Sequence, residues 1–359
     1  MVVVRPPRTP DSPARHRVHP PRAQHRARGE GPLLSAARAR PAGTRIAEIR
    51  DLVVTYTTSR GPLKAVDGVT LDLMEGEFLG VVGESGCGKT TMALTLLMMS
   101  DPGRVTGGTV KVEGTDILSL ADEALRKFRW EKVAMIFQAA MNALDPVKTV
   151  ESQIVETILQ HQDVTKEQAR DRVRKLLEAV SIDPARAKSY PHELSGGMRQ
   201  RAVIALALCL SPSILIADEP TTALDVVVQA EVIRTLKELQ RGLGLTVMLI
   251  THDISIMNET SDRLAIMYAG KIVEVGPTPQ IISAPQHPYT EALLNAVPTM
   301  GSGKGDVKGI PGSPPDLVSP PVGCRFSPRC PYAFDRCREE EPPLIFGGKD
   351  MVACWLRLK

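Results

Sequence analysis

One glycine-rich stretch constrains this chain more than any other feature: Gly83-Glu84-Ser85-Gly86-Cys87-Gly88-Lys89-Thr90-Thr91. It matches the pattern G-x-x-x-x-G-K-[ST] in full. The short apolar run 78–82 before it is typical of a strand, and 90–99 after it is typical of a helix. A turn in this position offers backbone N–H groups and the positive end of a helix to an anion. The sequence therefore predicts a phosphate-binding loop for a nucleotide such as ATP, in an α/β fold.

Two side chains of this loop carry specific expectations. We expect Lys89 to neutralise the β- and γ-phosphates and the Thr90 hydroxyl to ligate Mg²⁺. Cys87 has no required role, and we expect it only to make the site sensitive to thiol reagents.

A second apolar run, 214–217, ends in Asp218 and Glu219. A buried strand delivers its last residues to the carboxyl edge of the sheet, beside the phosphate loop. We expect Asp218 to hold Mg²⁺ through water and Glu219 to act as the general base on the attacking water. An acid pair alone is equally typical of a solvated strand end; the phosphate loop favours the catalytic interpretation.

The rest of the pattern alternates strands and helices, which indicates a largely parallel sheet. Further strands are predicted at 46–56, 65–73, 246–250, 263–267 and 271–275, and helices at 165–182 and 197–210. No run of eighteen apolar residues and no secretory signal is present, so a membrane role would require partner chains.

The first 45 residues differ in composition from the rest. They hold ten Arg and only two acids, +8, so the remainder carries −5 of the total +3. With many Pro and few large apolar residues, they are predicted to be disordered. Four interpretations of this segment remain open: a solvated tail, a start codon placed too early, a basic patch for acidic lipid or nucleic acid, and a transit peptide.

A further motif, Leu194-Ser195-Gly196-Gly197-Met198-Arg199-Gln200, lies shortly before the acid pair. A Ser cap followed by glycines at a helix start makes a second anion site. The string resembles the LSGGQ signature of ABC ATPases, with Met198 in place of the usual Gln. That resemblance implies a head-to-tail dimer, in which ATP lies between one chain's phosphate loop and Ser195, Gly196, Gly197 and Met198 of the other.

The same resemblance assigns other positions. Gln138 is similar to the Q-loop glutamine that contacts Mg²⁺ or the water, and Asp225 to the D-loop aspartate that reaches across the dimer. His252 is similar to the switch histidine at the γ-phosphate. Tyr56 resembles the aromatic residue that stacks on adenine, although a core role for it stays open. The family implies a P-loop NTPase core, RecA-like, with an antiparallel β part and an inserted helical subdomain at about 140–212, within a domain at 46–297.

Three features narrow the resemblance to the D-type ATPases of dipeptide and oligopeptide importers: the stretch 137–146, the pair 196–201 and 215–226, and the tail segments 287–290 and 324–331. The implied partners are a second ATPase, expected to be a paralogue, two membrane permeases and an extracellular substrate-binding protein, with this chain peripheral on the cytoplasmic face of a bacterial membrane. Nucleic acid is not expected. Importers of nickel, sugars or antibiotic peptides, and non-transport ABC ATPases, are the alternatives.

Residues 298–359 are predicted to form a separate extension that contains Cys324, Cys330, Cys337 and Cys354. Four thiolates could bind zinc or an iron–sulfur cluster, and the spacings are looser than C-x-x-C. The resemblance favours a 4Fe–4S cluster; zinc and free, packed thiols remain open.

Overall fold

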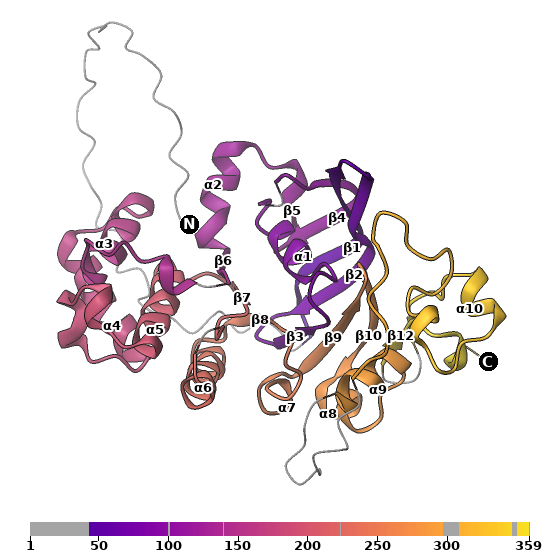
Figure 1. The fold of residues 1–359 in the computed structure, drawn as a ribbon. Helices are drawn as coiled ribbons and strands as arrows, with labels where there is room; N and C mark the ends of the chain where they lie inside the picture. Colours follow the sequence, from indigo (N-terminus) through magenta and orange to yellow (C-terminus); the bar gives the residue numbers. More distant parts are fainter. Residues whose placement is uncertain are drawn as a thin grey trace, which may run out of the picture.

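A computed structural model describes residues 43–99, 101–138, 140–222, 224–296, 309–346 and 350–358 (Figure 1). The predicted N-terminal tail lies outside these ranges except for its last residues, 43–45, and so does the boundary expected near 298.

A small antiparallel sheet has the strand order β2-β1-β4-β5. Its strands are β1 (Arg45–Thr58), β2 (Gly61–Met74), β4 (Arg104–Val112) and β5 (Thr115–Asp116). Buried and exposed residues alternate along β1, so one face is apolar. Ile49, Leu52 and Val54 on that face are fully buried in a core that includes Met92 and Leu96 from the α1 region. This sheet therefore covers the phosphate-loop helix.

The larger sheet has the order β11-β12-β10-β9-β3-β8-β7-β6. Five neighbouring strands are parallel: β9 (Arg263–Tyr268), β3 (Phe78–Val82), β8 (Thr246–Thr251), β7 (Ile214–Asp218) and β6 (Val133–Ile136). Every residue of β3, β7 and β8 is buried, as expected for strands covered on both faces. The antiparallel strands β10 (Lys271–Pro277), β12 (Met351–Val352) and β11 (Ile345–Phe346) complete the sheet.

The helices fall into two groups. Near the sheets lie α1 (Lys89–Thr95), α2 (Asp122–Glu131), α6 (Val226–Leu243), α7 (Met257–Thr260), α8 (Thr278–Ser283) and α9 (Pro288–Asn295), while α10 (Asp335–Glu339) belongs to the C-terminal extension (Figure 1). A helical lobe of α3 (Val150–His161), α4 (Lys166–Ala179) and α5 (Gly196–Ala207) lies to one side of the sheets (Figure 1). Within the described ranges, no helix is both long and apolar enough to cross a bilayer.

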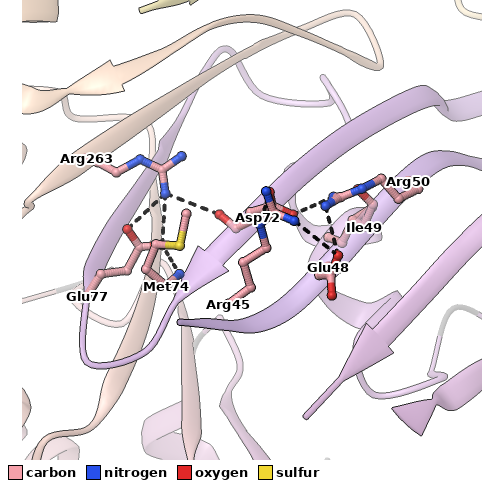
Figure 2. Close-up of polar contacts among 8 residues, drawn as sticks. All are labelled: Arg45, Glu48, Ile49, Arg50, Asp72, Met74, Glu77 and Arg263. Atoms are coloured by element: carbon pink, nitrogen blue, oxygen red, sulfur yellow. Dashed lines mark hydrogen bonds and ion pairs between the residues drawn. The ribbon is translucent and has the colours of Figure 1, made fainter. Parts of the chain in front are cut away.

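A polar cluster ties the two sheets together (Figure 2). Arg263 of β9 donates to both carboxylate oxygens of Glu77, at 3.1 and 3.0 Å, and to the Asp72 carbonyl oxygen at 3.3 Å. The Asp72 carboxylate in turn pairs with Arg45 and Arg50 of β1. The cluster thereby fixes the antiparallel sheet against the start of β3.

The C-terminal extension packs on the side of the sheets away from the helical lobe (Figure 1). Its strand β12 pairs with β10, with Val352 opposite Glu274. Its buried Arg325 bonds the Asp67 carboxylate on β2 and the Ala269 carbonyl oxygen after β9. The extension is thus attached to both sheets.

Candidate active site

The predicted site residues converge at the carboxyl edge of the parallel strands. The order β3-β8-β7-β6 brings the phosphate loop after β3 beside His252 after β8, the acid pair at the end of β7, and Gln138 after β6. A cavity of about 500 Å³ opens there, lined by Leu63, Ala65, Ser85, Gly86, Gly88, Lys89, Thr90, Thr91, Gln138, Glu219, His252 and Leu317. Long-range topology, and no single motif, builds this site.

The phosphate loop needs its glycines at two points. A Cβ on Gly83 would overlap the carbonyl oxygen of Met267, and one on Gly88 would overlap that of Ala65. Gly88 also has φ 101°, in the left-handed region, at the cap of α1. The loop therefore packs closely against β9 and β2.

The Lys89 ammonium is buried and bonded to the loop itself. Its Nζ donates to the carbonyl oxygens of Gly83 at 2.8 Å and Glu84 at 2.9 Å, and lies 3.7 Å from the Cys87 Sγ. Burial raises the pKa of the Cys87 thiol, with Lys89 partly opposing that shift. Burial and the raised pKa favour a thiol that reacts slowly with thiol reagents.

The acid pair occupies two different environments. Asp218 is 2% exposed, and burial raises its pKa, offset in part by a hydrogen bond with Thr90 and by the charge of Lys89. Glu219 has φ 44°, a left-handed conformation that is strained for a residue with a side chain. This backbone turns the Glu219 carboxylate away from the strand direction and toward the cavity.

Both oxygens of Glu219 have partners. Gln138 Nε2 donates to Oε2 at 2.8 Å, and His252 Nδ1 lies 3.1 Å from Oε1. The Thr222 hydroxyl also lies 3.3 Å from Oε2. Gln138, Glu219 and His252, which follow three different strands, are thus linked through the Glu219 carboxylate and line one cavity.

The predicted adenine residue is placed less directly. Tyr56 is partly buried against the core beneath β1 and β2, and its hydroxyl lies 3.3 Å from Thr91 Oγ1. Of the described residues, those lining the cavity do not include Tyr56.

The signature and D-loop residues lie together but away from this cavity. Ser195 caps α5, accepting from the Met198 N–H at 3.3 Å, and Asp225 caps α6, accepting from the Val228 N–H at 3.0 Å. A Cβ on Gly197 would lie 2.6 Å from Val228 Cγ1, so glycine permits the close approach of α5 and α6. Both caps are exposed, and neither lines the described wall of the nucleotide cavity.

The four cysteines of the extension surround one small hollow of about 10 Å³, which His287 and Phe326 also line. All six cysteines of the chain are free thiols. Burial raises the pKa of Cys324 to about 12, and the neighbouring thiols add to the shift. Within the described part of the chain, no three His, Cys, Asp or Glu side chains stand as a metal-ligand set.

Sequence reasoning missed the contacts that the extension and α9 make with the phosphate loop. Arg329 pairs with the Glu84 carboxylate, and the Tyr289 hydroxyl accepts from the Glu84 N–H at 2.9 Å. Arg329 and Tyr289 both lie in segments that resemble the peptide-importer subfamily. Nothing in the sequence around them indicates Glu84 as a partner, because it lies more than two hundred positions away.

Fold and site together define the class: an ATP-binding cassette ATPase. The family model described as ABC transporter matches residues 66–222, and the one described as oligopeptide/dipeptide transporter, C-terminal region, matches 273–337. A solved dimeric structure of a bacterial ABC transporter cassette superposes with a TM-score of 0.57 and 29% identity, covering 65% of this chain and 98% of that one.

Two relatives place the chain more narrowly. The dipeptide transport ATP-binding protein DppD of Bacillus subtilis is 44% identical over 318 residues, covering 87% of this chain and 95% of that protein. The oligopeptide transport ATP-binding protein OppD of the same organism is 43% identical over 319 residues, covering 87% and 89%. The chain belongs to the oligopeptide/dipeptide-transporter family of ABC ATP-binding proteins, which confirms the resemblance read from its motifs.

Proposed function

We propose that this chain binds and hydrolyses ATP in the cavity above the phosphate loop and thereby powers a membrane importer of dipeptides or oligopeptides. One observation carries the proposal: Gln138 and His252 both contact the Glu219 carboxylate, and all three residues line the same cavity as the phosphate loop. The substrate class rests on the relatives, which are named for dipeptide and oligopeptide transport.

The phosphate loop does the binding. Backbone N–H groups of the loop bind the triphosphate, and Lys89 exchanges its bonds to the Gly83 and Glu84 carbonyl oxygens for bonds to phosphate oxygens. Thr90, Asp218 and Gln138 supply the oxygen donors that suit Mg²⁺, which would neutralise phosphate charge when bound. Asp218 fits this role, because a nearby dication would favour the ionised form that burial now disfavours.

Hydrolysis is assigned to the set around Glu219. Its carboxylate takes a proton from the attacking water, and the bonds from Gln138 and His252 fix its orientation. The His252 side chain is 64% exposed, so it is free to turn toward the γ-phosphate.

A second ATPase subunit completes the site. The exposed Ser195 begins a helix start, with Gly196, Gly197 and Met198, that lies outside the lining of this chain's own cavity. We infer that this helix start contacts ATP held by a partner, as does the exposed Asp225. A solved neighbour of this chain is a dimer. The D-type sequence favours a paralogue as the partner.

An apolar groove of about 160 Å³ beside Gln138 is the proposed contact with the membrane. It is lined by Leu97, Trp130, Phe137, Ala143 and Val203 among others. An amphipathic helix of one permease would fill this groove, and a helix of the second permease would dock on the partner ATPase. This chain would then lie on the cytoplasmic face, with a separate substrate-binding protein outside. In this scheme residues 46–297 work as the cassette, the helices of about 140–212 as its moving lobe, and 298–359 as an added extension.

The catalytic assignment is tested by Glu219→Gln. Loss of the base should lower ATP turnover at least about 100-fold while Mg·ATP binding persists, so that an ATP-bound dimer accumulates on a sizing column. Glu238→Gln, an exposed carboxylate on α6, is the matched control and should turn over normally. Full ATPase activity of Glu219→Gln would refute the assignment, and failure of the reconstituted importer to take up peptides would refute the substrate class.

The cysteines of the extension are proposed to hold a 4Fe–4S cluster. Cys324, Cys330, Cys337 and Cys354 match the ligand number such a cluster needs and already share one hollow, although binding must draw them closer. Ligation of the four cysteines would supply folding energy to the extension. Protein purified without oxygen should contain about four irons per chain, lost in Cys330→Ser. Zinc instead of iron, or neither metal, would overturn the cluster.

A further inference from the structure

The C-terminal extension reaches the nucleotide site through one buried side chain. Arg329 donates from Nη1 to Glu84 Oε2 at 2.7 Å and from Nη2 to Oε1 at 2.9 Å, a two-pronged pairing with a residue of the phosphate loop. The Arg329 side chain is only 4% exposed. A planar guanidinium paired in this way holds a carboxylate in position as well as in charge.

The rest of Arg329 is equally fixed. Nε donates to the Pro311 carbonyl oxygen at 2.7 Å, Nη1 also to the Tyr268 hydroxyl at 3.2 Å, and Nη2 also to the Ile310 carbonyl oxygen at 3.4 Å. All five N–H donors of the guanidinium are therefore used. The Tyr268 ring lies 5.8 Å from the guanidinium carbon. Such a residue is built into the structure and has little freedom to move.

Glu84 is an awkward residue at its place. A loop that binds three phosphate groups gains from positive charge, and an ionised carboxylate within it repels the same anion. The structure turns the Glu84 side chain toward Arg329, while the Glu84 backbone N–H is bonded to Tyr289 and its carbonyl oxygen accepts from Lys89. The carboxylate is thus neutralised and drawn to the extension side of the loop.

We propose that Arg329 is a positioning residue of the nucleotide site: it neutralises Glu84 and holds the phosphate loop in its binding conformation, so that the extension contributes to ATP affinity. This inference rests on the proposed binding of ATP. It is independent of whether the nearby cysteines hold a metal.

The test uses the full-length chain, a fluorescent ATP analogue with Mg²⁺, and the reconstituted importer for KM and kcat. Arg329→Gln should raise the dissociation constant and the KM about tenfold with little change in kcat, because an uncompensated carboxylate then faces the triphosphate. Adding Glu84→Gln to Arg329→Gln should restore most of the lost affinity. Arg329→Lys, which keeps the charge and loses the fork, should fall between, and it serves if the glutamine variant does not fold.

Arg325→Gln is the matched control. Arg325 is as buried as Arg329 and stands in the same segment, but its side-chain bonds go to Asp67 and Ala269, outside the phosphate loop. It should lower the melting temperature and leave nucleotide affinity unchanged.

Each outcome bears on a separate statement. If the unmodified chain does not bind the nucleotide, the proposed function fails. If it binds and Arg329→Gln binds equally well, or the double variant is no better than Arg329→Gln alone, the inference about Arg329 is overturned. An affinity loss in Arg325→Gln equal to that in Arg329→Gln would also overturn it, because any disturbance of the extension would then suffice.

Discussion

The contact between the signature helix and the D-loop helix offers a sharp test of the packing. Gly197 lies in the first turn of α5, and an added Cβ would sit 2.6 Å from Cγ1 of Val228 on α6. Non-bonded carbon atoms of two residues do not lie that close in folded proteins, so Gly197→Ala must push the helices apart or turn Val228 from its rotamer. Valine in a helix has one strongly preferred χ1, which makes turning costly.

The expected magnitude follows from two opposing terms. Overpacking of this kind costs about 1–3 kcal/mol. Replacing glycine by alanine within a helix returns about 0.5–1 kcal/mol. The two ranges combine to a net loss between about 0 and 2.5 kcal/mol, so Gly197→Ala should lower the free energy of unfolding by about 1 kcal/mol, measured as a shift of the urea midpoint at unchanged slope.

Two companion variants separate the clash from other effects. Val228→Ala removes the clashing methyl group, so the double variant should be at least about 1 kcal/mol more stable than the sum of the single changes predicts. Gly242→Ala, at an exposed position of α6 with open space around the added Cβ, should be neutral or stabilising. Zero coupling between Gly197→Ala and Val228→Ala would refute the packing argument.

Three further predictions address other parts of the chain. Arg263→Met removes the cation beside buried Glu77, whose pKa burial already raises. Without that cation the folded-state pKa of Glu77 rises further. The variant should therefore be about 1–3 kcal/mol less stable than the unmodified chain at pH 8, and the difference should narrow toward pH 5 as Glu77 binds a proton. A difference that does not vary with pH in urea titrations would contradict this. Ser195→Asp keeps a good helix cap but puts negative charge where a partner's triphosphate should lie, so the melting temperature should hold while ATP-dependent dimerisation on a sizing column is lost; a variant that still dimerises would exclude the signature contact. Cys87 should be alkylated far more slowly in the folded chain than in urea, as mass spectrometry after timed labelling would show; equal rates would mean that the loop opens readily.

Much of the site was readable from the sequence because its motifs stand at fixed points of a parallel sheet. Strands β3, β7 and β8 appear in the sequence as short apolar runs. Lys89, Glu219 and His252 follow these strands and therefore lie at the same carboxyl edge of the parallel sheet. The pattern of strands and helices therefore predicted the class of fold and the residues that meet at its centre.

The parts that escaped prediction depend on long-range packing. Nothing local to Arg329 indicates Glu84 as its partner, because that pairing exists only once the extension has docked on the sheets. The left-handed backbone of Glu219 is likewise invisible in the sequence, since a glutamate rarely adopts it. The hydroxyl of Tyr289 reaches the loop from α9 for the same kind of reason.

From the proposed head-to-tail dimer we expect that one copy of this chain alone hydrolyses ATP poorly. Its own donors around a γ-phosphate would be Lys89, the phosphate loop and His252, which line the cavity. The far side of a bound triphosphate would face solvent, where water competes for hydrogen bonds and screens charge. The helix start at Ser195 could cover that side, but it belongs to the helical lobe, outside the lining of this cavity. Closure by a second cassette would then supply a second set of donors and exclude water in one movement, which ties hydrolysis to the dimer motion that a permease can use.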